Sequence, residues 1–144
     1  MVIISKGEII LMSRKTRQKE AILRVLQDNN THPTASWIYE QVRQEMPHIS
    51  LGTVYRDLKS LKKEGAIAEL EFAGSLNRFD GNTQRHYHFH CQKCDRIFDV
   101  AEPVDAEIDK RVARSNNCKV FYHRLEFYGL CPDCSSKAMV PLDY

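Results

Sequence analysis

Two Cys-x-x-Cys pairs constrain the fold of this 144-residue chain more than any other feature, Cys91/Cys94 and Cys131/Cys134. Each tight turn lets two thiolates converge on one ion, and four thiolates form a closed tetrahedral Zn²⁺ site. The segment between the pairs is longer than the ~15–20 residues of a simple zinc ribbon. We therefore expect a helix and a strand inside it, with zinc holding the ends of one domain together. A thioredoxin-like redox pair is the alternative, but no βαβ pattern surrounds the cysteines.

Length and composition set the broad class. A chain of this length suits one domain or two very small ones, and its net charge of only +2 names no partner. The longest apolar run near the start, Ile9–Met12, is too short for a secretory signal, and no run approaches the ~20 apolar residues of a membrane span. We expect a cytoplasmic protein, where paired cysteines favour metal over disulfides. The fifth cysteine, Cys118, is expected to be a small buried residue.

The first half is predicted to be a winged helix-turn-helix domain spanning residues 1–80, with 1–13 as an irregular extension. Three stretches have helical spacing of apolar residues, at 16–30, 34–46 and 50–65, and an alternating stretch predicts a β-hairpin at 68–80. Thr34 and Ser50 are the expected N-caps, and Gly65 ends the third helix. The expected apolar faces are Ile22, Val25 and Leu26 in the first helix, Trp37, Ile38 and Val42 in the second, and Val54, Leu58 and Leu61 in the third.

The third helix carries a polar and basic face opposite its apolar one. Tyr55, Lys59 and Lys62 share this face, and Arg56 lies beside it. A recognition helix needs long polar or cationic side chains that reach base edges and phosphates in the major groove. The alternative is an ordinary amphipathic helix with a solvated lysine-rich surface. The hairpin and the basic residues between Arg14 and Arg24 favour DNA binding.

The second half is predicted to be a small α/β domain at 86–144, joined by a polar hinge at 81–85. Strands are expected at 86–90, 96–100 and 119–130, a helix at 103–117, and a short helical turn at 135–139. Val104, Ile108 and Val112 would form the apolar stripe of the helix.

His86, His88 and His90 alternate along one expected strand and project to one face. Imidazoles two residues apart can chelate one ion, and Asp80, Asp99 and His32 offer further donors. A mixed nitrogen and oxygen set suits Fe²⁺, Mn²⁺ or Zn²⁺. The alternative is a polar strand with surface histidines. His48 is expected to be such a surface residue, and His123 is equally explained as a core residue or as a ligand.

Six motifs together resemble the ferric uptake regulator family of dimeric metal-dependent repressors. They are "HPTASWIYEQV", "SLGTVYRDLKSL", "NRFD", "HYHFHCQKC", "RLEFYG" and "CPDC", in the order of the family. The resemblance implies a winged helix, an α/β dimerisation domain, and a homodimer on inverted-repeat double-stranded DNA, with no membrane partner. It also implies structural zinc on the four paired cysteines and a regulatory Fe²⁺ or Mn²⁺ site between the domains. The regulatory ligands would be His32, Asp80, His86, His88 and Asp99.

The branch of the family depends on smaller differences. The His86-Tyr87-His88 form and Asp99 resemble the peroxide-sensing branch, whereas Arg56 resembles the iron-sensing one. Arg85 and Tyr87 occupy positions that would otherwise complete an additional metal site with His123. The N-terminal helix common in the family is short or missing here.

The resulting prediction is a metal-dependent repressor that senses hydrogen peroxide through iron-catalysed oxidation of His32 and His86. An iron-sensing or other metal-sensing uptake repressor is the alternative within the family. A hydrolytic zinc enzyme lacks a general base beside the ligands, and a zinc-ribbon interaction module would not explain the histidines or the wing. The predicted DNA contacts are Arg17, Ser50, Thr53, Tyr55, Arg56 and Lys59.

Overall fold

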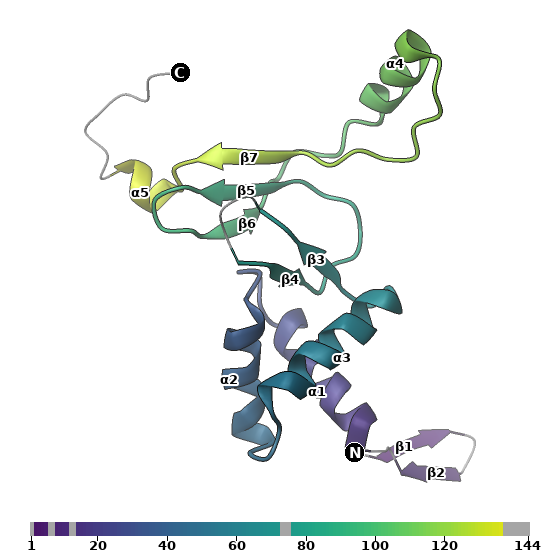
Figure 1. The fold of residues 1–144 in the computed structure, drawn as a ribbon, viewed down its shortest axis with the longest axis vertical. Coiled ribbons are helices and arrows are strands. Elements are labelled where there is room, and N and C mark those ends of the chain that lie inside the picture. Colours follow the sequence, from purple (N-terminus) through teal and green to yellow (C-terminus); the bar gives the residue numbers. More distant parts are fainter. Residues whose placement is uncertain (1, 6–7, 12–13, 73–75, 137–144) are drawn as a thin grey trace. The chain divides into compact units, whose positions relative to one another are not determined.

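The computed structural model describes residues 2–5, 8–11, 14–72 and 76–136 (Figure 1). The chain divides into two compact units, Met1–Thr83 and Gln84–Tyr144. The division falls within the polar 81–85 segment for which the sequence predicts a hinge. None of the helices within the described ranges is long and apolar enough to cross a membrane.

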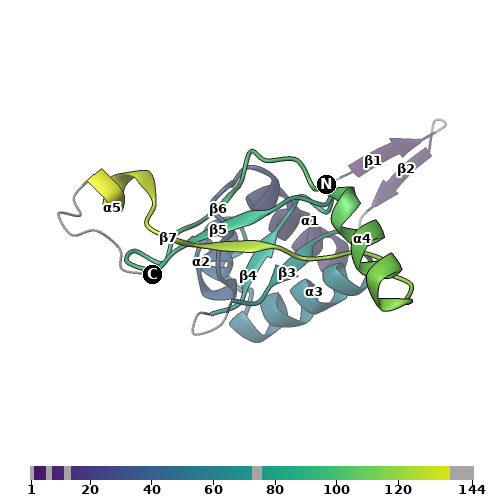
Figure 2. The ribbon, with the colours of Figure 1, turned by 90° about the horizontal axis from the view of Figure 1, so that it is seen from above.

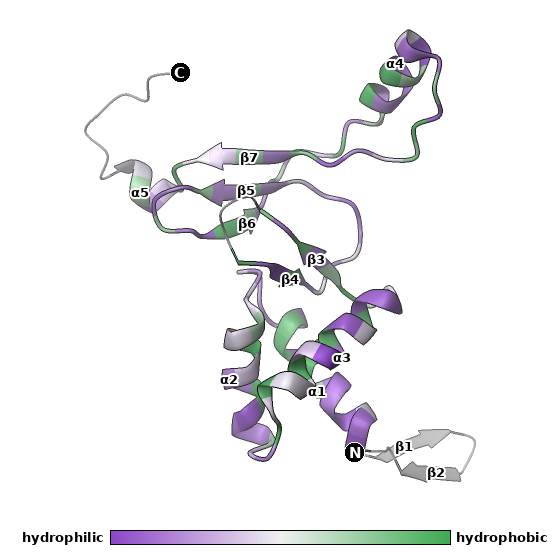
Figure 3. Ribbon diagram, in the orientation of Figure 1, coloured by the Kyte–Doolittle hydropathy of each residue, from purple (hydrophilic) through white to green (hydrophobic). Residues whose placement is uncertain are grey.

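Three helices build the core of the first unit: α1 (Arg14–Gln27), α2 (Ala35–Glu45) and α3 (Leu51–Lys63). Their apolar residues gather where the helices face one another (Figure 3). The buried apolar residues are Ala21, Ile22, Leu26, Ala35, Ile38, Val42, Ile49, Val54, Leu58, Leu61, Ile67 and Phe79. Burial of these side chains, at about 25 cal/mol per Å² of apolar surface, is what stabilises the unit.

Local signals begin and end these helices as predicted. Thr34 Oγ1 accepts the N–H of Trp37 at the start of α2, and Ser50 Oγ accepts that of Thr53 at the start of α3. α3 ends in a Schellman motif, in which Ala66 N–H donates to Leu61 C=O and the N–H of Gly65 donates to Lys62 C=O. Gly65 has φ +77°, a left-handed conformation that favours glycine.

The prediction that Trp37 belongs to the apolar face of α2 is wrong. Its side chain is 41% exposed, whereas Ala35, Ile38 and Val42 are buried. These three positions are spaced i, i+3 and i+7 and so share one face of a helix. Trp37 is one residue before Ile38, so its side chain is rotated by about 100° around the helix axis from that of Ile38.

A two-stranded antiparallel wing follows α3, formed by β3 (Ala68–Leu70) and β4 (Arg78–Asp80). A second antiparallel pair, β1 (Val2–Ser5) and β2 (Glu8–Leu11), lies where the sequence predicts an irregular extension. The order of three helices and a wing is that of a winged helix-turn-helix domain.

The second unit is a three-stranded sheet in the order β6-β5-β7. Its strands are β5 (His88–Cys91), β6 (Ile97–Asp99) and β7 (Glu126–Gly129). β5 pairs antiparallel with β6 and parallel with β7. The helices α4 (Ala106–Asn116) and α5 (Pro132–Ser136) lie at opposite ends of this sheet (Figures 1 and 2).

Three expectations for the second unit need correction. The strand expected at 119–130 is confined to β7, because 119–125 pair with no neighbouring strand. The last helix is α5, earlier than expected, and 137–139 lie outside the described residues. Cys118 is exposed rather than buried. It follows the left-handed cap of α4, a helix with no buried residue.

The Schellman motif generates a paired prediction for the stability of the first unit. Gly65→Ala should lower its free energy of unfolding by about 1 kcal/mol, because alanine is strained at positive φ.

Gly52→Ala is the matched control. Gly52 lies in the first turn of α3, where an added Cβ meets only the Ser50 hydroxyl at 3.9 Å. The control should raise the free energy of unfolding by roughly 0.5–1 kcal/mol. Fluorescence of Trp37, the one tryptophan, reports unfolding of this unit. Equal effects of the two substitutions would contradict the assignment.

Candidate metal centres

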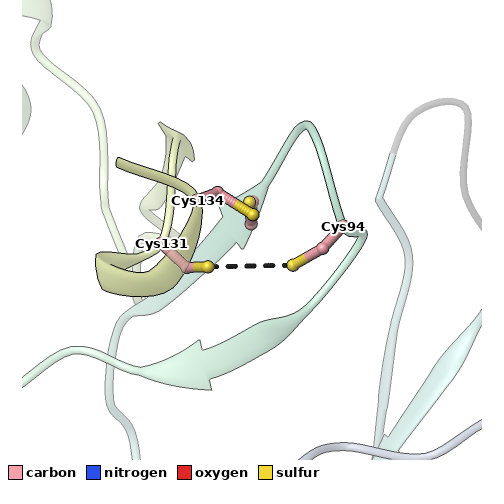
Figure 4. A group of neighbouring side chains, drawn as sticks. Cys94, Cys131 and Cys134 are labelled. Carbon is pink, nitrogen blue, oxygen red and sulfur yellow. Dashed lines mark hydrogen bonds between the residues drawn. The ribbon is translucent and has the colours of Figure 1, made fainter. Parts of the chain in front are cut away.

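The four paired cysteines converge in the second unit. Their four Sγ atoms all lie within 4.8 Å of one another. Cys91 ends β5, Cys94 follows in the turn to β6, and Cys131 and Cys134 lie at α5. The Sγ atoms of Cys94 and Cys131 are 3.8 Å apart, and Cys134 lies beside them (Figure 4). The two turns thus place four thiols around one point, as predicted.

The local environment shifts the pKa values of the four thiols in opposite directions, lowering those of Cys91 and Cys131 and raising those of Cys94 and Cys134. Burial raises the pKa of the Cys91 thiol, but hydrogen bonds from the backbone of Cys94, Cys131 and Lys93 outweigh it and lower the pKa to about 6. A hydrogen bond with Cys131, together with burial, raises the pKa of Cys134 to about 12. A divalent ion binds thiolates, so it would displace the protons that remain on the cluster. Four sulfur donors at this spacing fit Zn²⁺.

A second donor group lies on the same sheet, at the opposite end of β5 from Cys91. The register of β5 and β6 places His88 directly opposite Asp99. Asp99 Oδ1 is 3.0 Å from Nε2 of His86 and 3.6 Å from Nε2 of His88. The Nδ1 atom of His86 lies 2.5 Å from the carbonyl of Gln84. Because that carbonyl accepts the Nδ1 proton, the Nε2 lone pair remains available to a metal.

The first unit holds the other two predicted ligands, His32 and Asp80, with His32 Nδ1 3.6 Å from Asp80 Oδ1. Both side chains are buried. β4 positions Asp80, and the segment before α2 bridges to β4 through Thr34 and Arg78. His32 has φ +50°, a conformation that a non-glycine residue adopts at some energetic cost and that is frequent at functional sites. The set of five predicted ligands is thus divided between the units as a pair and a triad.

The remaining histidines have other environments. The Nε2 atom of His90 lies 2.5 Å from a carboxylate oxygen of Asp95. His48 is exposed, as predicted. Both ring nitrogens of His123 are hydrogen-bonded, Nε2 with the Tyr87 hydroxyl at 2.7 Å and Nδ1 with Asp109 at 2.8 Å. These contacts favour the interpretation of His123 as a satisfied structural residue.

The exposed face of α3 is the one that the sequence predicts to read DNA. Tyr55 is 52% exposed, and Arg56 and Lys59 are exposed with it. A salt bridge of 2.7 Å joins Lys62 of α3 to Glu69 of the wing. This hydrogen bond is the main reason that the pKa of Glu69 is lowered and that of Lys62 is raised. The wing is therefore tied to α3 by a charged pair.

A basic recess of about 580 Å³ adjoins the N-terminus of α3. It is lined by Arg14, Lys15, Gln18, His48, Ile49, Ser50, Thr53 and Arg56. Sequence reasoning noted Arg14 and Lys15 as part of a basic cluster but did not single them out. Arg17, which it did single out, lines a different recess with Glu20, Arg24, Glu45 and Met46. A helical wheel of α1 carries this signal, because residues 14, 15 and 18 share a face that residue 17 does not.

A winged helix followed by a sheet with sulfur and histidine donor groups is typical of metal-responsive DNA-binding regulators. The profile of the ferric uptake regulator family matches residues 12–128. The peroxide-responsive repressor PerR of Staphylococcus aureus strain USA300 is 40% identical over 124 residues, which cover 86% of this chain and 84% of that protein.

Solved structures agree with this match. The peroxide stress regulator of Campylobacter jejuni is 27% identical with a TM-score of 0.72, covering 84% of this chain and 91% of that one. The Helicobacter pylori ferric uptake regulator is 28% identical with a TM-score of 0.71, covering 88% and 83%. The chain belongs to the ferric uptake regulator family. The predictions of this family and of a transcriptional regulator rather than an enzyme are confirmed.

Substitution of the cluster cysteines should remove the metal and destabilise the second unit. Cys91→Ser and Cys134→Ser each leave three thiolates, so we expect loss of the tightly held zinc and a lower melting temperature. Cys118→Ser is the matched control, because Cys118 is exposed and is not among the four clustered cysteines. Elemental analysis after dialysis, with thermal melting, measures both effects. Retention of one zinc per chain in either cluster variant would refute the four-cysteine site.

Proposed function

We propose that this chain is a metal-dependent, peroxide-responsive transcriptional repressor. The observation that carries the proposal is the division of the histidine and aspartate donors between the two units. His32 and Asp80 belong to the unit with the recognition helix, and His86, His88 and Asp99 belong to the other. An ion bound by all five would hold the two units at one angle. In a dimer that angle sets the spacing of two recognition helices, and hence the fit to two DNA half-sites.

The donor chemistry supports Fe²⁺ or Mn²⁺ at this regulatory site. Three imidazoles and two carboxylates form a set that suits these ions, whereas Zn²⁺ is assigned to the four sulfurs. The relatives named above as peroxide-responsive or peroxide stress regulators support a sensing role. Fe²⁺, when bound, supplies the electron that splits hydrogen peroxide.

The residues of the chain decide what is damaged. The imidazoles of His86 and His32 are the proposed targets, since carboxylates resist oxidation and the four thiolates are held in a separate closed site. Net transfer of one peroxide oxygen to an imidazole carbon replaces its C–H bond by C–OH, the other oxygen leaves as water, and the modified ring is a weaker ligand. The His86 Nε2 atom, beside Asp99, is the donor that this change removes. The DNA-competent arrangement then loses the ion that favours it, and DNA is released.

A homodimer supported by the second unit completes the proposal. Among its described residues, the large apolar side chains that are exposed are Val112, Phe121, Tyr122, Leu125, Phe127 and Tyr128. An exposed apolar set of this size is typical of a subunit interface, and closed symmetry about it would present two winged helices to an inverted repeat. We place the repressor in the cytoplasm, where reduced thiols can bind zinc.

For DNA contact we propose two groups of residues. Tyr55 and Arg56 read bases, whereas Lys59 and Arg17 contact phosphates. Ser50 and Thr53 lie at the N-terminus of α3, where a phosphate would be stabilised by the helix dipole. Lys15 and Arg14 join this set because they line the same recess as Ser50 and Arg56.

Peroxide should release DNA from the Fe²⁺ form and leave the Mn²⁺ form bound, because Mn²⁺ gives up an electron far less readily. Gel shifts before and after peroxide measure the release. Peptide mass spectrometry should find the mass of one added oxygen on the peptides holding His86 or His32, only with iron bound. His48, exposed and outside the ligand set, is the internal control and should stay unmodified. Asp99→Glu should retain metal-dependent binding but respond less to peroxide.

Two outcomes would overturn this mechanism. DNA release with both histidines unmodified and the cysteines oxidised would move the sensor to the sulfur site. DNA binding that responds only to removal of iron, and not to peroxide, would assign the chain to iron sensing.

The two groups of DNA contacts should respond differently to substitution. Arg56→Ala should narrow the gap in affinity between operator and random DNA by ~1–3 kcal/mol, because base contacts carry specificity. Lys59→Ala should weaken binding to both DNAs alike and reduce the slope against salt by about one. Binding titrations at several salt concentrations measure both. Equal losses on the two DNAs for Arg56→Ala would refute its base-reading role.

A further inference from the structure

A fully buried carboxylate lies within the proposed recognition helix. Asp57 is 0% exposed and belongs to the inner face of α3 with Val54, Leu58 and Leu61. Among the described residues, neither of its carboxylate oxygens has a hydrogen-bond partner. Its closest ion pair is with Arg56, whose Nε lies 3.9 Å from Asp57 Oδ1. A buried carboxylate without hydrogen bonds is costly to keep ionised.

Cations of α1 and α3 make the ionised form tolerable. Burial raises the pKa of Asp57, and the positive charges of Arg56, Lys19 and Lys15 act in the opposite direction, in that order of strength. Lys19 also donates to Ser60 Oγ at 2.7 Å and pairs with Glu64.

Within the described part of the first unit, α2 and the wing bring no further charge beside the carboxylate. The charged residues of α2 are all exposed, and they pair with one another or with α1, as Arg43 does with Glu40 and Glu45 does with Arg24. On the wing, Glu69 pairs with Lys62. The ionisation of Asp57 therefore depends on three cations.

Two of these three cations also line the recess that we propose to contact DNA. Arg56 and Lys15 line the basic recess at the N-terminus of α3, beside Ser50. Phosphate at this recess would attract both cations and add negative potential above the buried carboxylate. Both effects disfavour the ionised form of Asp57. The DNA and the carboxylate thus compete for the same positive charge.

We propose that Asp57 is a proton-linked positioning residue, whose carboxyl takes up a proton when DNA occupies the recess. The proposal rests on the DNA-binding function assigned to α3 above. DNA binding raises the pKa of this carboxyl further, so between the free and bound pKa values the complex holds more protons than the free protein. Affinity for DNA then rises as pH falls through that window, and it levels off on either side. At fixed metal occupancy, this linkage tightens repression as pH falls through that window.

The test is calorimetric titration of the Mn²⁺-loaded protein with a random-sequence duplex at mildly acidic pH. Binding enthalpies in two buffers of different ionisation enthalpy give the number of protons taken up. We expect Asp57→Asn to take up fewer protons on DNA binding than the unsubstituted protein does. We also expect it to bind roughly two- to fivefold more tightly near neutral pH, because one negative charge beneath the DNA is gone. A merely structural role for Asp57 would not change proton uptake.

Asp28→Asn is the matched control, since it makes the same charge change at an exposed position just after α1. It should leave proton uptake unchanged. Histidines contribute equally to all three proteins and cancel in the differences.

Equal proton uptake in the unsubstituted protein and Asp57→Asn, with both bound to DNA, would overturn the inference and leave the proposed function intact. Failure of the unsubstituted protein to bind DNA would overturn both. If Trp37 fluorescence shows Asp57→Asn to be unfolded, the test uses nuclear magnetic resonance of the unsubstituted, zinc-loaded protein instead. The carbon resonance of the Asp57 carboxyl should then titrate at a higher pH with DNA than without it. An unchanged midpoint would overturn the inference.

Discussion

The pairing of β5 with both of its neighbours is the constraint on which the chemistry of the second unit depends. This strand of four residues holds His88 opposite Asp99 at one end and Cys91 opposite Gly129 at the other. A structural site and part of a regulatory one therefore share a single rigid element. Loss of metal from the cysteines would loosen the turn after Cys91, and with it the register that brings His88 to Asp99. A closed sulfur site would thus preserve the geometry of the neighbouring site at which we propose oxidation.

In the first unit, α3 likewise serves two purposes. Its inner face supplies Val54, Leu58 and Leu61 to the core, while its outer face carries the residues proposed to contact DNA. Asp57 interrupts the inner face with a charge, at a site where an apolar residue would be more stable. One face of α3 belongs to the core and the other is proposed to contact DNA. A buried carboxyl that interacts with the cations of the exposed face couples the two.

Periodicity and spacing predicted most of this fold, because helices, caps and Cys-x-x-Cys turns are decided within a few neighbouring residues. Tertiary packing decided the rest. Trp37 was misplaced because a stripe read from apolar residues alone does not tell which side of α2 meets α1 and α3. Cys118 was misplaced because α4, which it follows, buries none of its residues against the described part of the chain. The sequence offered His32, Asp80 and Asp99 as further donors, and the family resemblance joined them to His86 and His88 as one ligand set. Only Asp99 and the two histidines beside it can be placed together by a single register.

The segment around Tyr87 connects the sheet of the second unit to α4 through side-chain hydrogen bonds. Its hydroxyl accepts the N–H of Asp105, the N-cap of α4, and is hydrogen-bonded to His123. His123 in turn reaches Asp109 within α4. Tyr87 is thus hydrogen-bonded to the start of α4, whereas His86 and His88, on either side of it, approach Asp99. These hydrogen bonds connect the start of α4 and its first turn to Tyr87 and His123, and so orient the helix. The exposed apolar residues of the unit are then presented independently of the regulatory metal, so the proposed dimer would persist whether or not metal and DNA are bound.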